Sequence, residues 1–220
     1  MTQNNRLTDF SSFQAIWRRN LLAGADDNSQ AIHQQLIKAY QEPGRFYHTL
    51  DHIECCLGLF EDIKDIAHNA DALALSIWFH DAIYEPGADD NEQRSADWFM
   101  DETKNMLEDS FRDTVYTHIM ATLHGDAEIT DHDSRLMIDI DLSSFGMPWP
   151  IFLRDSERVR KELPHLTDTE FYPKQCAFSQ GLLEKPRFFQ SEYFFQHYEA
   201  QARQNLTDYY HYIEKKLAQA

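Results

Sequence analysis

The stretch of residues 74–84 constrains the fold of this chain more than any other part of the sequence. It is apolar on nearly every face of a helix, yet it carries His80 next to Asp81 at its centre. A helix that is apolar all round is typical of a segment buried inside a bundle. Burying this pair is costly unless the carboxylate is neutralised or coordinates a metal ion. Neighbours on a helix point about 100° apart, so an ion shared by both residues would sit at the helix edge and need further ligands.

The composition favours a compact, mostly helical protein. Of the 220 residues, 42% are hydrophobic, and only seven are glycine and seven are proline. This length predicts one domain, residues 1–220. Within it we expect a flexible arm over residues 1–12, a core over about residues 30–165, and a helical extension over residues 166–220 that packs on the core. The predicted fold class is therefore all-α, with an N-terminal arm and a long C-terminal helix.

Apolar residues recur at helical spacing along most of the chain, and proline or glycine separates several of these segments. The segment around His80 should end at Glu85-Pro86-Gly87, and the aromatic residues of the last helix should form core or a dimer contact, which makes a homodimer compatible with the sequence. The expected helices cover about residues 13–22, 29–40, 53–63 (with a start left open between residues 45 and 53), 72–84, 88–100, 112–124, 131–142, 151–163, 167–183 and 191–220.

The charge and the cysteines limit the partners and the compartment. Lysine and arginine total 20 and aspartate and glutamate total 37, a formal net charge of −17. Such a surface repels nucleic acid polymers and anionic lipid, so we expect neither nucleic acid nor a membrane as partner. The three cysteines and the polar first residues favour a cytoplasmic protein with reduced thiols. A small phosphorylated ligand is compatible with this charge, because a metal ion and a few cations can reverse the field in one pocket.

Two further residues are candidates to complete a metal site with His80 and Asp81. His52 lies at the buried edge of its predicted helix, and Asp141 interrupts a strongly apolar run. A conflict between pattern and burial often marks function. His48 is the alternative to His52, because residues four apart share a helix face if the helix begins early enough. Asp139 is the alternative to Asp141.

Two imidazoles and two carboxylates would balance the charge of one divalent cation. Mixed nitrogen and oxygen ligation suits the transition metals Mn, Fe, Co, Ni and Zn. Mg is also compatible with the carboxylates, although imidazole disfavours it. The sequence thus predicts a divalent metal ion, of a transition metal, as cofactor.

Four runs of the sequence, in this order, carry a resemblance to a known family: residues 45–53 (RFYHTLDHI), 79–84 (FHDAIY), 90–96 (DNEQRSA) and 139–142 (DIDL). They resemble the HD superfamily of metal-dependent phosphohydrolases, and more narrowly its bacterial group of predicted HD phosphohydrolases. The later run 199–206 resembles the C-terminal helix of this group. The resemblance therefore covers most of the chain from about residue 30.

The resemblance implies an HD-domain helical bundle whose metal ligands are His52, His80, Asp81 and Asp141. It implies a metal-dependent phosphohydrolase that acts on a small phosphoester, such as a nucleotide or related metabolite. In such an enzyme a metal-bound water, its pKa lowered toward about 7, attacks phosphorus while the ion polarises a phosphoryl oxygen.

Roles outside the ligand shell are inferred from residue type. Glu92 or Asp81 would orient or deprotonate the water. Cations are needed to admit a phosphate to an acidic protein, and the residues assigned to substrate binding are Arg45, His48, Asn91 and Arg94.

Two alternatives to a mononuclear hydrolase stay open. Further ligation by His118 and His124 would give a site with two metals, and two irons there would favour a di-iron HD-type oxygenase. The other alternative is a non-catalytic HD-fold sensor that binds a metal or a nucleotide without turnover.

Overall fold

The computed structural model of the chain describes residues 6–123 and 129–218. Within these residues the regular structure is helical, and the β-structure is an isolated bridge between Leu21 and Leu107. The all-α fold class predicted from the sequence is confirmed. The described helices are α1 (Phe10–Asn20), α2 (Ser29–Ala39), α3 (Leu50–Ile63), η1 (Lys64–Ile66), α4 (Ala70–Phe79), α5 (Asn91–Glu102), α6 (Asp109–Ala121), α7 (His132–Asp141), η2 (Leu142–Gly146), α8 (Trp149–Glu162), α9 (Asp168–Glu184) and α10 (Glu192–Leu217).

The chain divides into two compact units, residues 1–140 and 141–220. The division comes earlier in the chain than residue 166, where the sequence suggested that an extension begins. It falls just before the last residue of α7, so this helix belongs to the first unit through Ile140.

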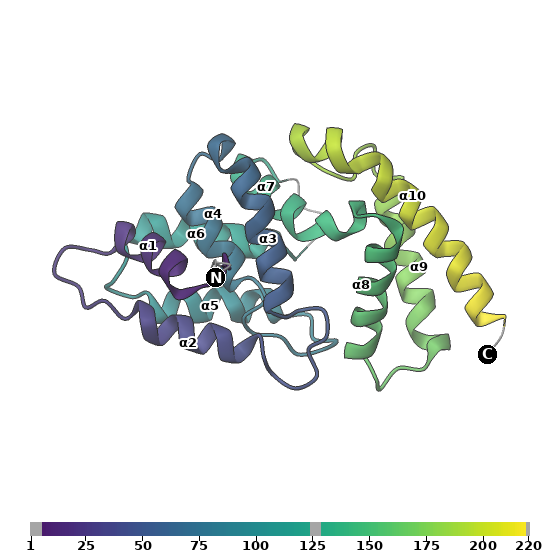
Figure 1. Cartoon of the computed structure of the whole chain (residues 1–220), viewed down its shortest axis with the longest axis horizontal. Coiled ribbons are helices and arrows are strands. Elements are labelled where there is room, and N and C mark those ends of the chain that lie inside the picture. The colour runs from purple at the N-terminus through teal and green to yellow at the C-terminus, as the bar shows by residue number, and fades with distance from the viewer. Residues whose placement is uncertain (1–5, 124–128, 219–220) are drawn as a thin grey trace, which may run out of the picture. The chain divides into compact units, whose positions relative to one another are not determined.

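The first unit is built around α4, which contacts α1, α3, α5 and α6 (Figure 1). Every residue from Ala72 to Phe79 is buried, so α4 has no solvent-facing side, as its apolar sequence predicts. Its N-terminus is capped by Asn69, whose side chain accepts a hydrogen bond from the Ala72 N–H at 3.1 Å. The buried helix around which the sequence analysis began is therefore the centre of this unit.

The end of α4 differs from the prediction. The helix stops at Phe79 instead of continuing to Glu85, His80 is its C-cap, and Asp81 lies in the turn that follows. The apolar pattern continues beyond Phe79 because the following residues stay buried in the unit: His80, Asp81 and Ala82 are all buried. Residues 80–82 are buried although the helix has ended. The apolar pattern of a sequence indicates which residues are buried, so it did not show where this helix ends.

The start of α7 is joined to the start of α4 by Asp133. This buried carboxylate accepts hydrogen bonds from the backbone N–H groups of His68 at 2.9 Å and Asn69 at 2.7 Å. The first N–H groups of a helix, and those just before it, lack partners within the helix. Asp133 supplies acceptors for two of these N–H groups, and it thereby fixes where α7 begins relative to α4.

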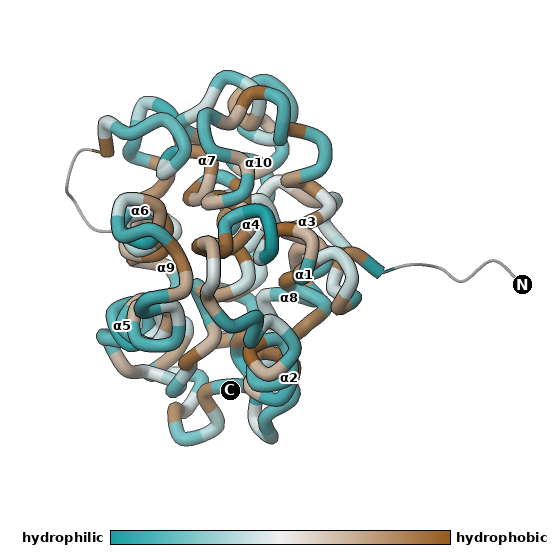
Figure 2. The backbone as a smooth tube through the Cα atoms, turned by 90° about the vertical axis from the view of Figure 1, so that its left-hand side faces the viewer, coloured by the Kyte–Doolittle hydropathy of each residue, from teal (hydrophilic) through white to brown (hydrophobic). Residues whose placement is uncertain are grey.

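The amphipathic helix α5 buries one face. Its buried residues are Asn91, Ser95, Ala96 and Phe99, which recur at helical spacing. Hydrophilic residues predominate along the rest of this helix, as Figure 2 shows. The same spacing turns Asn91 inward and leaves Arg94 exposed.

The N-terminal segment is held more closely than a flexible arm would be. α1 begins at Phe10, so residues 10–12 are helical. Before it, the N–H groups of Leu7 and Thr8 both donate to the carboxylate of Glu54 in α3 at 2.9 Å. The arm predicted over residues 1–12 is thus anchored from residue 7 onward, and residues 1–5 lie outside the described part of the chain.

The second unit contains η2 and α8 to α10 around its own apolar core. Aromatic residues of the long C-terminal helix contribute to this core, and the cluster consists of Phe152, Phe171, Tyr172, Tyr209 and Ile213. Asn205 is buried and donates to the carbonyl oxygens of Phe145 and Met147 at 2.7 Å, which fastens η2 to α10. Among the described residues, no helix combines the length and the apolar character needed to cross a lipid bilayer.

Candidate metal centre

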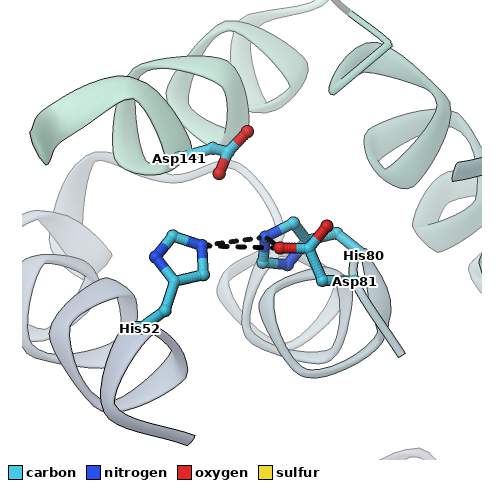
Figure 3. A group of neighbouring side chains, drawn as sticks. All are labelled: His52, His80, Asp81 and Asp141. Carbon is cyan, nitrogen blue, oxygen red and sulfur yellow. Dashed lines mark hydrogen bonds and ion pairs between the residues drawn. The ribbon is translucent and has the colours of Figure 1, made fainter. Parts of the chain in front are cut away.

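Four side chains that the sequence singled out point toward one another (Figure 3). His52 comes from α3, His80 caps α4, Asp81 follows it, and Asp141 is the last residue of α7. Each offers one ligand atom, and these atoms all lie within 4.8 Å of one another. The Nε2 atoms of the two histidines are 3.2 Å apart, and Oδ2 of Asp81 lies 3.0 Å from His80 Nε2 and 3.6 Å from His52 Nε2.

The orientation of His80 is set by the helix that it caps. Its Nδ1 atom lies 2.9 Å from the carbonyl oxygen of Ile77. A carbonyl oxygen can only accept a hydrogen bond, so Nδ1 carries the proton and donates. In the neutral ring Nε2 then presents a lone pair toward His52 and Asp81. Metal-ligating histidines commonly hold their second nitrogen in this way.

The ring of His52 is buried and held by neighbours on two sides. The Sγ atom of Cys56, one turn later in α3, lies 3.8 Å from Nδ1 and 3.7 Å from Nε2. The ring of Tyr47 packs at a centroid distance of 4.9 Å. The sequence analysis did not assign a site role to Cys56, although the four-residue spacing from His52 places both on one helix face.

The distances among His52, His80 and Asp81 fit a shared ion, and the ligand atom of Asp141 lies within 4.8 Å of theirs. Two atoms that each lie about 2.1 Å from one metal are about 3.0 to 3.4 Å apart at octahedral or tetrahedral angles. The separations of 3.0 and 3.2 Å match this range, and 3.6 Å is close to it. Two carboxylates and two imidazole nitrogens that converge so closely bring together lone pairs, which a divalent cation would satisfy. The residues present therefore fit a divalent metal ion.

Comparison of the chain with protein-family models, curated proteins and solved structures gave no match. The function is therefore inferred from the geometry of this group and its surroundings.

The two alternative ligands lie outside the group. α3 begins at Leu50, so His48 precedes the helix and does not share a helical face with His52. Instead the His48 ring stacks on Tyr84 at a centroid distance of 4.1 Å. Asp139 is completely buried but does not belong to the group of mutually close ligand atoms, whereas Asp141 does.

Arg45, expected at the substrate, has both terminal guanidinium nitrogens hydrogen-bonded to the protein itself. Nη1 donates to the carbonyl oxygen of Asp81 at 2.7 Å, and Nη2 donates to that of Ala82 at 2.9 Å. Weaker contacts reach the His48 carbonyl at 3.4 Å and the Glu42 carboxylate at 3.3 Å. The side chain is only 3% exposed. A substrate could reach these nitrogens only if the protein gave up its own hydrogen bonds.

The three predicted site residues of α5 occupy different environments. Asn91 is buried and pairs with the backbone of Glu85, accepting from its N–H at 2.9 Å and donating to its carbonyl at 3.0 Å. Arg94 is exposed and forms ion pairs with Glu85 at 3.1 Å and Asp90 at 3.5 Å. Glu92 is half-buried in the first turn and lies outside the group of mutually close ligand atoms. Catalytic work by Glu92 stays a prediction.

His118, one of the two histidines proposed for a second metal, does not belong to the group of mutually close ligand atoms. His118 is buried, and its Nε2 lies 3.5 Å from the carboxylate of Asp131. Burial lowers the pKa of His118, and the nearby carboxylates of Asp131 and Asp133 oppose this effect. His124 lies outside the described residues.

Proposed function

We propose that the chain is a metal-dependent phosphohydrolase of the HD type that acts on a small phosphoester such as a nucleotide or related metabolite. The single observation that carries the proposal is the convergence of the side chains of His52, His80, Asp81 and Asp141 on one point. The same four residues are singled out by the sequence pattern alone. They come from segments up to 89 positions apart, which is the separation of His52 and Asp141.

The residues divide the work of holding an ion. His52 and His80 would supply neutral nitrogens, and Asp81 and Asp141 would supply the negative charge that a divalent cation needs. When bound, the ion would supply Lewis acidity toward a phosphoryl oxygen and lower the pKa of a coordinated water. The Nδ1 hydrogen bond of His80 to Ile77 keeps its Nε2 aimed at the site without rearrangement.

The electrostatics favour a small substrate. With a net charge of −17, the protein repels a long polyanion. A single phosphate group needs only local compensation, which the metal would provide. No disulfide bond joins the three cysteines, all of which lie in the described part of the chain, and this supports the further proposal of a cytoplasmic protein.

The test couples metal analysis with a substrate screen. The purified protein should contain, or take up, about one equivalent of Mn, Fe, Co, Ni or Zn, and the loaded form should hydrolyse members of a panel of nucleotides and other phosphoesters. Chelation should remove the activity and the same metal should restore it.

Three results would overturn the proposal. A protein that takes up none of these metals is not a metal-dependent hydrolase. A loaded protein that binds a nucleotide tightly but turns over no phosphoester is the sensor. Two irons bound per chain would instead indicate the oxygenase, for which ligands beyond the four in this group are needed.

A further inference from the structure

The end of α4 is fastened by side chains from the preceding segment of the chain. The last carbonyl groups of a helix have no partners within it. In α4, the Trp78 carbonyl accepts from the buried hydroxyl of Tyr40 at 2.9 Å. Beyond the helix end, the carbonyls of Asp81 and Ala82 accept from Arg45. The proposed ligand His80 lies between these attachment points, and the proposed ligand Asp81 carries one of them.

Arg45 is suited to this position by charge and shape. The C-terminal end of a helix carries partial negative charge, which a cation stabilises. The planar guanidinium can donate to two carbonyl oxygens at once, which a lysine ammonium does less well. Its central carbon also lies over the rings of Tyr40 and Tyr84, at 5.3 and 5.4 Å from the ring centroids. The side chain is therefore held by two aromatic rings as well as by the hydrogen bonds of its terminal nitrogens.

The hydrogen bond to the Asp81 carbonyl acts on the same residue that offers Oδ2 to the metal centre. Fixing this carbonyl and the next one limits rotation of the Asp81 backbone, and that rotation decides where the carboxylate points. The ion pair of Arg45 with Glu42 adds little, because the Glu42 side chain is 55% exposed. The contacts that matter are thus the two to backbone carbonyls.

We propose that Arg45 is a positioning residue for the metal centre, which holds the His80–Asp81 turn through the Asp81 and Ala82 carbonyls, and that it does not bind substrate. This inference rests on the proposed metal site. It replaces the expectation that the Arg45 guanidinium contacts a phosphate.

The test measures Mn²⁺ binding to the chelator-treated full chain by titration calorimetry, without any substrate. Removing a group that supports a metal ligand commonly lowers metal affinity by about 10- to 100-fold. We expect a loss of this size in Arg45→Lys, which keeps the charge but not the two-carbonyl geometry, and in Arg45→Gln. Tyr40→Phe, which removes the neighbouring attachment at Trp78, should give a smaller loss.

The matched control is Arg18→Gln, because Arg18 is an arginine whose side chain is 60% exposed and pairs with Asp27, which is not a proposed ligand. It should bind Mn²⁺ as the wild-type protein does. Arg45→Lys is the milder variant, and its far-UV circular dichroism spectrum should match that of the wild-type protein. A loss of Mn²⁺ affinity with an unchanged spectrum is then due to lost positioning of the ligands and not to unfolding.

The outcomes distinguish this inference from the proposed function. If the wild-type protein binds Mn²⁺ and Arg45→Lys binds it equally well, the positioning role is wrong and the metal site stands. If Arg45→Lys instead changes only the KM for a phosphoester, Arg45 is a substrate-binding residue. If the wild-type protein binds neither Mn²⁺ nor Zn²⁺, both proposals fail together.

Discussion

Nε2 of His80 lies 3.0 Å from Oδ2 of Asp81, although these residues are consecutive in the chain. Consecutive residues within one helix would point about 100° apart. They converge here because α4 ends at Phe79, so His80 is its C-cap and Asp81 already lies in the turn. The end of this helix is therefore what allows both side chains to serve one ion.

The first prediction concerns these two side chains. His80→Ala and Asp81→Ala should each abolish metal retention, measured by elemental analysis of the purified protein, because each removes one of four donors. Helicity should stay close to wild type in far-UV circular dichroism. His211→Ala and Asp101→Ala are the controls, since both residues are exposed, and they should keep the metal. Full metal content in both site variants would refute the assignment.

The second prediction concerns stability without metal. The ligand atoms of Asp81 and Asp141 lie within 4.8 Å of each other, so their charges repel by about 1 kcal/mol or more when no cation is present. Chelator-treated Asp141→Asn should therefore be at least as stable as chelator-treated wild type in urea unfolding.

The same experiment gives the opposite order when metal is added. Mn²⁺ at 100 times its Kd should stabilise the wild-type protein by about 2.7 kcal/mol, and Asp141→Asn should gain much less. Equal unfolding midpoints for the wild-type protein with chelator and with Mn²⁺ would contradict the expected stabilisation by metal. In chelator, a lower stability of Asp141→Asn than of wild type would contradict the expected repulsion.

The sequence predicted which four residues come together better than it predicted how the group is held. Burial of polar residues on apolar helices is a local signal, and it identified His52, His80 and Asp141. The end of α4 depends on Tyr40 and Arg45, which precede it by more than 30 positions, and helical periodicity carries no information about such contacts. A buried tyrosine hydroxyl usually needs a hydrogen-bond partner. A tyrosine at a predicted core position was therefore the feature of the sequence that could have indicated the role of Tyr40.

His48 and His52 do not share a helix face, for a similar reason. Its spacing from His52 would have placed both on one face only if α3 had begun before residue 48, and α3 begins at Leu50. Helix starts depend on the turn before them. Here the N–H groups of His52 and Thr49 bond to carbonyls within the turn, at Thr49 and Tyr47.

The third prediction tests the junction of α7 with α4. In Asp133→Asn the amide can accept from only one of the two N–H groups of His68 and Asn69, and its NH₂ group faces the other. We expect a loss of about 1 to 3 kcal/mol in the free energy of unfolding, the cost of an unsatisfied buried polar group. Asp101→Asn, at an exposed site in α5, is the control and should change stability little. A junction variant as stable as the control would mean that Asp133 does not hold the two helices together.

The fourth prediction uses the buried imidazole of His118. Burial lowers its pKa in the folded protein, so between the folded and unfolded pKa values the unfolded chain binds more protons. Stability should therefore be fully present above the unfolded value of about 6.5 and fall as the pH drops below it. The lowered pKa of Asp131 acts in a separate window, because its contribution is lost only as the pH falls below about 4.

The measurement is the free energy of unfolding of wild type and His118→Gln in chelator, over about pH 5 to 7.5. Glutamine fills similar space without titrating, so the wild-type protein should lose stability relative to the variant as the pH falls. Subtracting the two curves removes the titration of groups that both proteins share, including those of the metal centre. His211→Gln removes an exposed imidazole and should follow the wild-type curve. Parallel curves for wild type and His118→Gln would show that the imidazole ionises as readily in the folded protein as in the unfolded chain.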